Sequence, residues 1–176
     1  MTVQEKYKAS IPSLKEQFKL KNIMAVPKLV KVVVSVGTGK NHDKKRLELV
    51  GDRMAKITGQ KPSPRPAKIA IASFKSRQGD IVGMKVTLRG ARMYGFLDKL
   101  LNITLPRIRD FRGYPVTGID NMGNFTLGIK EHNIFPESAD DDIKDSFGMA
   151  ITFTTTSKDK KLTEALLRAI GVPFKK

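Results

Sequence analysis

The chain has 176 residues, no cysteine, and 33 Lys and Arg against 17 Asp and Glu, a formal net charge of +16. This length predicts one domain with a core of its own, and the missing thiols exclude disulfides, cysteine-ligated zinc and thiol catalysis. No stretch approaches the roughly 20 apolar residues of a membrane span, and the N-terminus lacks the apolar core of a signal peptide. We therefore expect a soluble intracellular protein. Its excess of cations favours a polyanionic partner, nucleic acid ahead of a membrane surface, over a role in solubility alone.

The first third of the chain predicts helix, strand and helix. Apolar residues recur at helical spacing over 7–18, and Pro12 inside that segment predicts a kink or a restart. Residues 29–36 alternate as a strand does, with Val30 on the apolar side. A second helix is predicted over 43–57, and it ends at a glycine, as helices often do.

The sequence GTGK at 37–40 stands between that strand and that helix, where a phosphate-binding loop would lie. Neither glycine-rich consensus is met, because Val34 and His42 occupy positions that require glycine. We expect these glycines to let the backbone turn and approach a partner closely. The alternative is a phosphoryl-handling enzyme that uses this loop together with Arg107, Arg109 and Arg112.

The middle of the chain predicts a hairpin followed by a helix. Prolines alternate over 62–66, which suits an extended edge segment, and 67–74 is predicted to be a strand. A projecting loop is predicted over 74–80, and 82–90 is the return strand. Residues 92–104 are predicted to form a helix that stops before a proline and faces the core with Met93, Phe96, Leu97, Leu100 and Leu101.

The last third supplies two more strands and a helix. Residues 124–130 and 149–156 alternate cleanly between apolar and polar side chains. Ser157 is the expected N-cap of the final helix, which Gly171 ends. Each well-formed strand is apolar on one side only. The pattern predicts an α+β fold: one domain over 1–176, with a mostly antiparallel five-stranded sheet and helices packed on one face.

The opposite side of these strands holds hydroxyls, amides and cations and no carboxylate. Threonine is a good strand residue in its own right, but that preference does not explain the missing acids. Such a surface suits phosphate and 2′-hydroxyl groups, so we expect RNA to dock on this face or at its edge. The residues on it are Lys31, Ser35, Lys85, Thr87, Arg89, Asn124, Thr126, Lys130, Thr152, Thr154 and Thr156.

Chemistry-bearing residues are few. His42 and His132 are each isolated among polar residues, so we expect both on the solvated surface. Six carboxylates lie within 131–145, and this acidic segment is not expected to face phosphates. Consecutive acids at 140–142 point in different directions, so a bound cation is not expected. We expect no catalytic residue, no metal and no cofactor. A free RNA chaperone would share the charge but would not need an acidic segment.

Several long stretches resemble the large-ribosomal-subunit protein five family of bacterial type, whose members bind 5S rRNA. The resemblance covers nearly the whole chain. It rests on AVPKLVKVVVSVGTG (25–39), ITGQKP (57–62), AIASFKSRQG (70–79), GMKVTLRGARMYGFLDKL (83–100), LPRIRDFRG (105–113), GNFTLGIKEHNIFPE (123–137), GMAITFTTT (148–156) and the C-terminal ALLRAIGVPF.

The resemblance implies a structural role in the large subunit, on the ribosome in the cytoplasm, without enzymatic activity, membrane or small-molecule substrate. Such proteins help to attach 5S rRNA in the central protuberance. They also contact 23S rRNA, peptidyl-site tRNA, neighbouring large-subunit proteins and, in an intersubunit bridge, a small-subunit protein. A basic small-subunit partner would account for the acidic segment.

The resemblance and the strand pattern together predict three groups of site residues. The rRNA-binding group is Lys31, Ser35, Gly37, Thr38, Gly39, Lys40, Gln60, Lys61, Pro62, Lys68, Lys85, Thr87 and Arg89. The tRNA-binding group is Phe74, Lys75, Ser76, Arg77, Gln78 and Gly79. The intersubunit group is Arg109, Arg112, Tyr114, Glu137, Asp140, Asp141 and Asp142.

The chain departs from the family pattern at four positions. The family usually has Asn at Ser35, Thr at Arg65, a basic residue at Pro66 and Ser at Ala70. A single hydroxyl at Ser35 replaces an amide that offers two groups for contact, so the departures bear on individual rRNA contacts.

Overall fold

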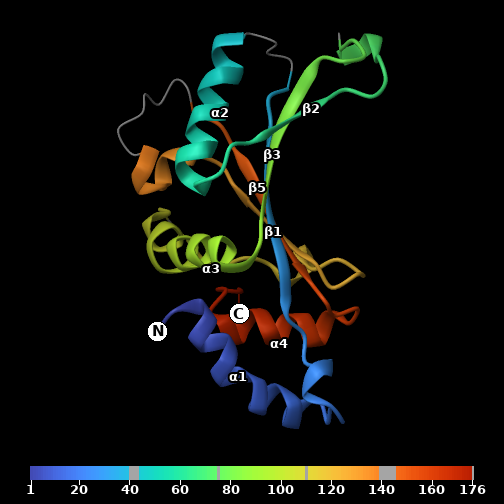
Figure 1. Ribbon diagram of the computed structural model, residues 1–176, viewed down its shortest axis with the longest axis vertical. Coiled ribbons are helices and arrows are strands. Elements are labelled where there is room, and N and C mark those ends of the chain that lie inside the picture. The colour runs from blue at the N-terminus through green and yellow to red at the C-terminus, as the bar shows by residue number, and fades with distance from the viewer. Residues whose placement is uncertain (40–43, 75, 110, 139–145, 176) are drawn as a thin grey trace. The chain divides into compact units, whose positions relative to one another are not determined.

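The computed structural model describes residues 1–39, 44–74, 76–109, 111–138 and 146–175. Five strands form one sheet in the order β2-β3-β1-β5-β4 (Figure 1). Their bounds are β1 Leu29–Gly37, β2 Ser63–Pro66, β3 Ile81–Leu88, β4 Phe125–Ile129 and β5 Met149–Thr155. Together with the four α-helices found in these described residues, this sheet confirms the predicted α+β class and the predicted number of strands.

The pairing of the strands is antiparallel. Ser63 of β2 lies opposite Lys85 of β3, and the partner numbers fall as the β2 numbers rise. The same holds for β1 and β5, because Lys28 contacts Thr156 whereas Ser35 contacts Ala150. An antiparallel sheet can keep one face solvated, which gives a clean alternation of burial along each strand. β5 shows it, with Met149, Ile151, Phe153 and Thr155 buried.

The contacts within the chain define two compact units, and each is described by itself. Unit 1 comprises Met1–Val32, Arg89–Leu127 and Thr152–Lys176. Unit 2 comprises Val33–Leu88 and Gly128–Ile151. The division falls within β1, β4 and β5.

Unit 1 contains the helices α1 (Val3–Gln17), α3 (Gly90–Lys99) and α4 (Lys160–Ile170), and α1 packs along α4 (Figure 1). α1 begins with a capping box, in which the Thr2 hydroxyl and the Glu5 carboxylate each accept the other residue's backbone N–H. The helix continues through Pro12, so the restart predicted there does not occur. One 3₁₀ turn, η1 (Ile23–Ala25), leads into β1, and another, η5 (Val116–Gly118), precedes β4.

The helix predicted over 92–104 changes its hydrogen bonding midway. α3 is followed by a π-helical turn, η3 (Leu100–Thr104), and by a 3₁₀ turn, η4 (Leu105–Arg107). The Leu105 N–H bonds the carbonyl of Leu100, five residues back, which is the π-type spacing. The predicted inward face is confirmed, since all of its members are buried: Met93, Phe96, Leu97, Leu100 and Leu101.

The predicted N-cap of the last helix is wrong by two residues. The carboxylate of Asp159 accepts the Lys161 N–H and caps α4. Ser157 lies two residues before the cap, where its hydroxyl accepts the Asp159 N–H and donates to the Asp159 carbonyl. Gly171 ends the helix in the left-handed conformation, at φ 98°, as predicted.

Unit 2 contains the helix α2 (Lys44–Thr58), which packs against β3, and the 3₁₀ turns η6 (His132–Ile134) and η7 (Pro136–Ser138). Gly59 follows α2 at φ 66°, as predicted. The prediction of a solvated His132 is wrong, because its side chain is 0% exposed. Its ring stacks on Phe147 at 4.1 Å between ring centres, and its Nδ1 accepts the Phe147 N–H at 3.4 Å. His42 lies outside the described residues.

The strand predicted over 67–74 is also wrong. β2 ends at Pro66, and a 3₁₀ turn, η2 (Ala72–Phe74), occupies the end of that range. The Ala67 N–H bonds the Asp80 carbonyl at 2.8 Å, and the Gly79 N–H bonds the Ala67 carbonyl at 3.0 Å. These bonds close the base of an excursion over 67–80, called the arm below, at the far end of the β2–β3 hairpin (Figure 1). The projecting loop is thus longer than the predicted 74–80.

The prediction for the side chain of Val30 is wrong. It was expected on the apolar side of its strand, yet its side chain is 37% exposed, while Leu29 is buried instead. The alternation settles only from Val32 onward, where Val32, Val34 and Val36 are all buried. Among the described residues, no helix is long and apolar enough to cross a membrane.

Candidate RNA interface

In unit 2 the polar strand residues lie beside one another on β1 and β3. Ser35, Lys85 and Thr87 are half-buried, as expected of residues on an open sheet face. The Ser35 hydroxyl is 3.4 Å from the Ala150 carbonyl, and the Gln60 amide donates to the Thr87 carbonyl at 3.4 Å. The structure therefore brings Gln60 to Thr87, two residues that the sequence assigned to one rRNA-binding group.

In unit 1 the corresponding residues are mostly threonines. The hydroxyls of Thr126 on β4 and Thr152 on β5 are 3.0 Å apart and hydrogen-bond across the strands. Thr154 follows on the same side of β5, and Thr156 accepts the Lys28 N–H through its hydroxyl at 3.1 Å. Lys31 is half-buried on β1. This part of the sheet offers hydroxyls and a cation to a partner.

The charged side chains on the strands are all positive. None of the five strands, as described, contains an aspartate or a glutamate. The cations on them are Lys31, Arg65 and Lys85, and Arg89 stands exposed at the N-cap of α3. An anionic ligand on such a surface meets hydroxyls and cations without like-charge repulsion.

The glycine loop after β1 is open to a partner. A Cβ atom added at Gly37 or Gly39 would meet no atom within 4 Å, and Gly39 has φ 60°. The Thr38 N–H bonds the Val82 carbonyl at 3.1 Å, which fixes the loop to β3. The space beside both glycines is open. Lys40 lies outside the described residues.

A groove of about 610 Å³ lies in unit 2 between α2 and the β2–β3 hairpin. Lys61 and Pro62, both assigned to the rRNA-binding group, line it together with Met84. Carboxylates line it as well, from Glu48 and Asp52. The sequence did not predict this groove, because its walls come from three segments.

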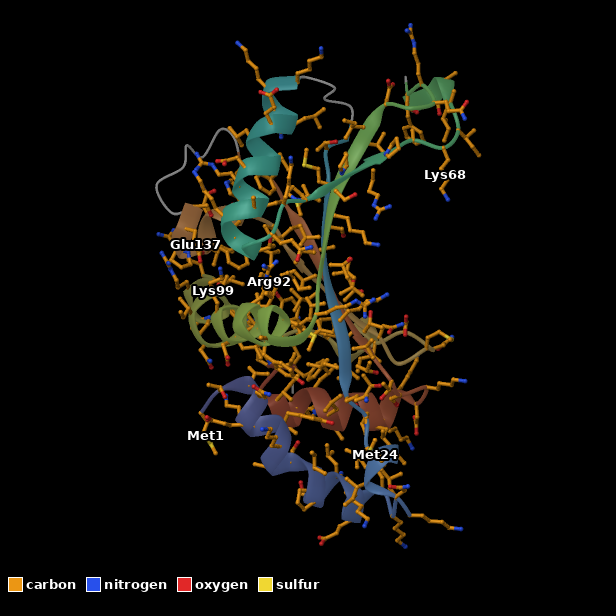
Figure 2. The ribbon with its side chains drawn as sticks, viewed as in Figure 1. Met1, Met24, Lys68, Arg92, Lys99 and Glu137 are labelled. Atoms are coloured by element: carbon orange, nitrogen blue, oxygen red, sulfur yellow. The ribbon has the colours of Figure 1, made fainter. Side chains whose placement is uncertain are left out.

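The arm presents the residues of the tRNA-binding group. Phe74 is 60% exposed, and Arg77, Gln78 and Gly79 are exposed as well. The Asp80 carboxylate accepts the Arg77 N–H at 2.8 Å and shapes the turn. Lys68, assigned to the rRNA-binding group, lies on the arm (Figure 2), whereas Ser35 of the same group lies on β1. Lys75 lies outside the described residues, and Ser76 is half-buried.

The segment 105–114, called the arginine segment below, presents Arg109 and Arg112 to solvent. Its end is fixed to the C-terminus, because the Tyr114 N–H bonds the Pro173 carbonyl and the Lys175 N–H bonds the Tyr114 carbonyl, both at 2.9 Å. The Tyr114 ring packs edge-on against Phe111 at 5.2 Å. Burial raises the pKa of the Tyr114 hydroxyl.

The intersubunit group is divided between the two units. Tyr114 and the two arginines belong to unit 1, whereas Glu137, which is exposed, belongs to unit 2. The three aspartates at 140–142 lie outside the described residues. No group of three or more possible metal ligands occurs in the part of the chain that the structure describes.

Two apolar pairs on the surface were not predicted from the sequence. Ile69 and Ile71 of the arm are exposed, as are Ile23 and Met24 before β1. The sequence pattern assigned the first pair to a strand and the second to a connector. The signal that could have found both is an apolar pair within a short segment that also holds lysines.

Two family models cover most of the chain. The model described as Ribosomal protein L5 matches residues 22–77, and a second model, for the C-terminal part of the same ribosomal protein family, matches 81–174. The chain is also 46% identical over 176 residues to the protein named Large ribosomal subunit protein uL5 in Streptococcus pneumoniae strains Hungary19A-6 and CGSP14. The alignment covers 99% of this chain and 98% of each relative.

The chain belongs to the ribosomal protein L5 family. Members of the ribosomal protein L5 family are structural components of the large ribosomal subunit and not enzymes, so the phosphoryl-handling alternative is wrong. Membership also makes the chain an rRNA-binding protein that resides on the ribosome in the cytoplasm. The family predicted from the sequence motifs is thereby confirmed.

Proposed function

We propose that this chain binds 5S rRNA through the polar side of its sheet and helps to attach it in the central protuberance of the large subunit. The observation that carries the proposal is the absence of carboxylates from all five described strands. Ser35, Lys85 and Thr87 form the part of this surface in unit 2, and the Gln60 amide lies beside them. The glycine loop at 37–39 extends it with exposed backbone.

The chemistry of these groups fits a folded RNA. Lysines neutralise phosphates and release counterions, while hydroxyls and amides match 2′-hydroxyls and base edges. The chain has 12 aromatic residues, and the largest on the strands, Phe125 and Phe153, are buried in the core. Recognition therefore relies on RNA shape and backbone rather than on stacking of single-stranded bases.

Salt dependence tests this proposal. The double variant Lys31→Ala plus Lys85→Ala should weaken binding to purified 5S rRNA and reduce the log–log salt slope by about 1.4 to 1.8, since each lost phosphate contact removes about 0.7 to 0.9. Lys8→Ala, which removes an exposed lysine from α1, is the control and should change neither quantity. Equal losses in both variants, or a wild-type complex insensitive to salt, would contradict the proposal.

The arm is the second part of the proposal, as a contact for peptidyl-site tRNA. Phe74 and Arg77 are both exposed on it; an aromatic ring can stack on a base, and a guanidinium can pair with a phosphate. Lys75 adds a second cation to the same stretch of sequence. Lys68 also lies on the arm, and we propose that it contacts an RNA phosphate.

The third part concerns protein partners. Arg109 and Arg112 in unit 1, and Glu137 with the acids at 140–142, are proposed to face a small-subunit protein in an intersubunit bridge. The acidic residues would pair with a basic partner, which fits a segment that RNA would avoid. Contacts with 23S rRNA and with neighbouring large-subunit proteins complete the assembly. The whole chain, 1–176, would act as one ribosomal-protein domain.

A further inference from the structure

The connection between α1 and β1 in unit 1 exposes two large apolar side chains. Met24 is 82% exposed and Ile23 is 56% exposed, and they are adjacent in the turn η1. Figure 2 shows Met24 on this connection. Single exposed apolar residues are ordinary, but an adjacent pair on a basic connection suggests a surface that a partner covers.

The backbone of this connection is well fixed by hydrogen bonds. The Asn22 side chain accepts the Met24 N–H at 2.9 Å, and the Ala25 N–H bonds the Asn22 carbonyl at 3.1 Å. Val26 is buried immediately after the turn and anchors it to unit 1. Ile23 and Met24 are therefore held outward by a formed turn.

One residue of the connection adopts a conformation that is unusual for its type. Lys19 has φ 49° and is the non-glycine residue with positive φ among those described. A left-handed conformation costs a residue with a Cβ about 1–2 kcal/mol. The Leu20 N–H bonds the Lys15 carbonyl at 3.0 Å across this turn, so the chain reverses sharply after α1.

Cations flank the apolar pair. Lys19, Lys21 and Lys28 are all exposed, and the sequence from 17 to 42 contains no aspartate or glutamate. The cores of protein–protein interfaces are depleted of lysine, whereas nucleic-acid interfaces are enriched in cations. The combination of lysines and a small apolar tip thus favours an RNA partner over a protein partner.

We propose that the connection over 19–28 is a second RNA contact of this chain, in addition to the polar side of its strands. In it, Ile23 and Met24 pack on riboses and base edges in the shallow minor groove of a folded RNA. The three lysines neutralise phosphates on either side. Proteins that bind the DNA minor groove also place apolar side chains such as Ile and Met against the bases.

Site-specific photo-crosslinking on assembled ribosomes identifies the occupant. Met24→p-benzoylphenylalanine should give a crosslinked product that ribonuclease digests, and Ile23→p-benzoylphenylalanine is the replacement should the first variant fail to assemble. The same amino acid at Ser13, an exposed position on α1, is the control and should give much less of this product. A crosslink to protein only, no crosslink, or an equal RNA yield from Ser13 would overturn the proposal.

A charge variant supplies an independent measurement. Lys19→Gln plus Lys21→Gln should reduce the salt slope for retention of the protein on large subunits by about 1.4 to 1.8. Lys6→Gln plus Lys8→Gln removes two lysines of the same spacing from α1 and should leave that slope unchanged. Equal slopes for the two double variants would overturn the proposal. The proposed 5S rRNA contact is tested separately by the strand variant Lys31→Ala plus Lys85→Ala, so failure of one proposal can be told from failure of the other.

Discussion

The arm and the arginine segment are both basic excursions from the fold, and they are held in opposite ways. The arm is closed at its base by backbone bonds between Ala67 and the residues 79–80, while its apolar side chains stay exposed. The arginine segment is joined to the C-terminus on both sides of Tyr114, and its aromatic rings are packed. The arm thus exposes apolar and charged side chains together. The arginine segment exposes its arginines while its aromatic rings are packed.

This difference matters for the partners proposed for each. A contact with tRNA must form and break as tRNA moves, and a segment with few buried apolar contacts adapts at small cost. A bridge between subunits gains from side chains that are already positioned, because less freedom is lost on binding. Packing around Gly113, Tyr114 and Phe174 provides such a support for Arg112.

Gly113→Ala should give the largest effect. Gly113 has φ 86°, and an added Cβ would stand 2.8 Å from the Phe174 carbonyl carbon and 2.9 Å from the Lys175 nitrogen. Backbone strain and overpacking together should cost about 3 kcal/mol of unfolding free energy, measured by urea denaturation.

Gly79→Ala is the matched control on the arm. Gly79 has φ 93°, but an added Cβ would meet no atom within 4 Å, so only backbone strain of about 1–2 kcal/mol remains. Equal destabilisation by the two variants would mean that packing against the C-terminus does not distinguish the arginine segment from the arm.

Phe174→Ala should have the next largest effect. The Phe174 ring lies 5.2 Å from the Phe125 ring, and the Arg168 guanidinium lies 5.2 Å from the centre of the Phe174 ring. Loss of these contacts at a half-buried site should cost about 2 kcal/mol in the same denaturation assay. Phe74→Ala, at an exposed ring on the arm, should change stability by less than about 0.5 kcal/mol. The comparison fails if Phe74→Ala destabilises the protein as much.

Lys75→Ala plus Arg77→Ala should have the smallest effect on the protein itself. Because both residues belong to the arm's sequence and to none of the five strands, 5S rRNA affinity should stay within about twofold of wild type, whereas tRNA binding in the peptidyl site should weaken. Filter binding of 5S rRNA to the free protein measures the first affinity, and filter binding of tRNA to ribosomes measures the second. Equal losses would refute the division between strand contacts and arm contacts.

The predictions from sequence were most accurate for strands in which every second side chain is buried. Val86 and Leu88 of β3, and Phe125, Leu127 and Ile129 of β4, are buried at the alternating positions that their sequences predicted. Successive side chains of a strand point to opposite faces of the sheet, so every second residue is buried when one face is covered. The spacing of apolar residues in the sequence therefore predicts which side chains are buried. The family motifs fall on the same elements.

The errors arose where burial depends on distant residues. His132 looks polar in its local sequence, but Phe147, fifteen residues away, supplies the ring that stacks on it. Over 67–74, β-branched and aromatic residues suggested a strand, yet pairing with β3 ends at Pro66. Nothing local distinguishes an apolar residue that packs from one that a partner covers.

Two further errors concern hydrogen bonds rather than burial. Ser157 and Asp159 both offer an acceptor ahead of α4, and geometry alone selects Asp159. The π-helical turn at Leu100–Thr104 buries the same apolar residues as an α-helix would, so periodicity cannot reveal it. In the candidate interface, residue types were predictable, but the placement of Lys68 on the arm required the path of the chain.

The edge strand β2 has a consequence for the life of the chain before assembly. An unpaired strand edge invites a second chain to add to the sheet, which leads to aggregation. Two of the four residues of β2, Pro64 and Pro66, have no N–H to offer such an intruder, and Arg65 between them adds charge. At this edge of the sheet, a newly made molecule that has not yet met its RNA is thereby less prone to pair with its own copies.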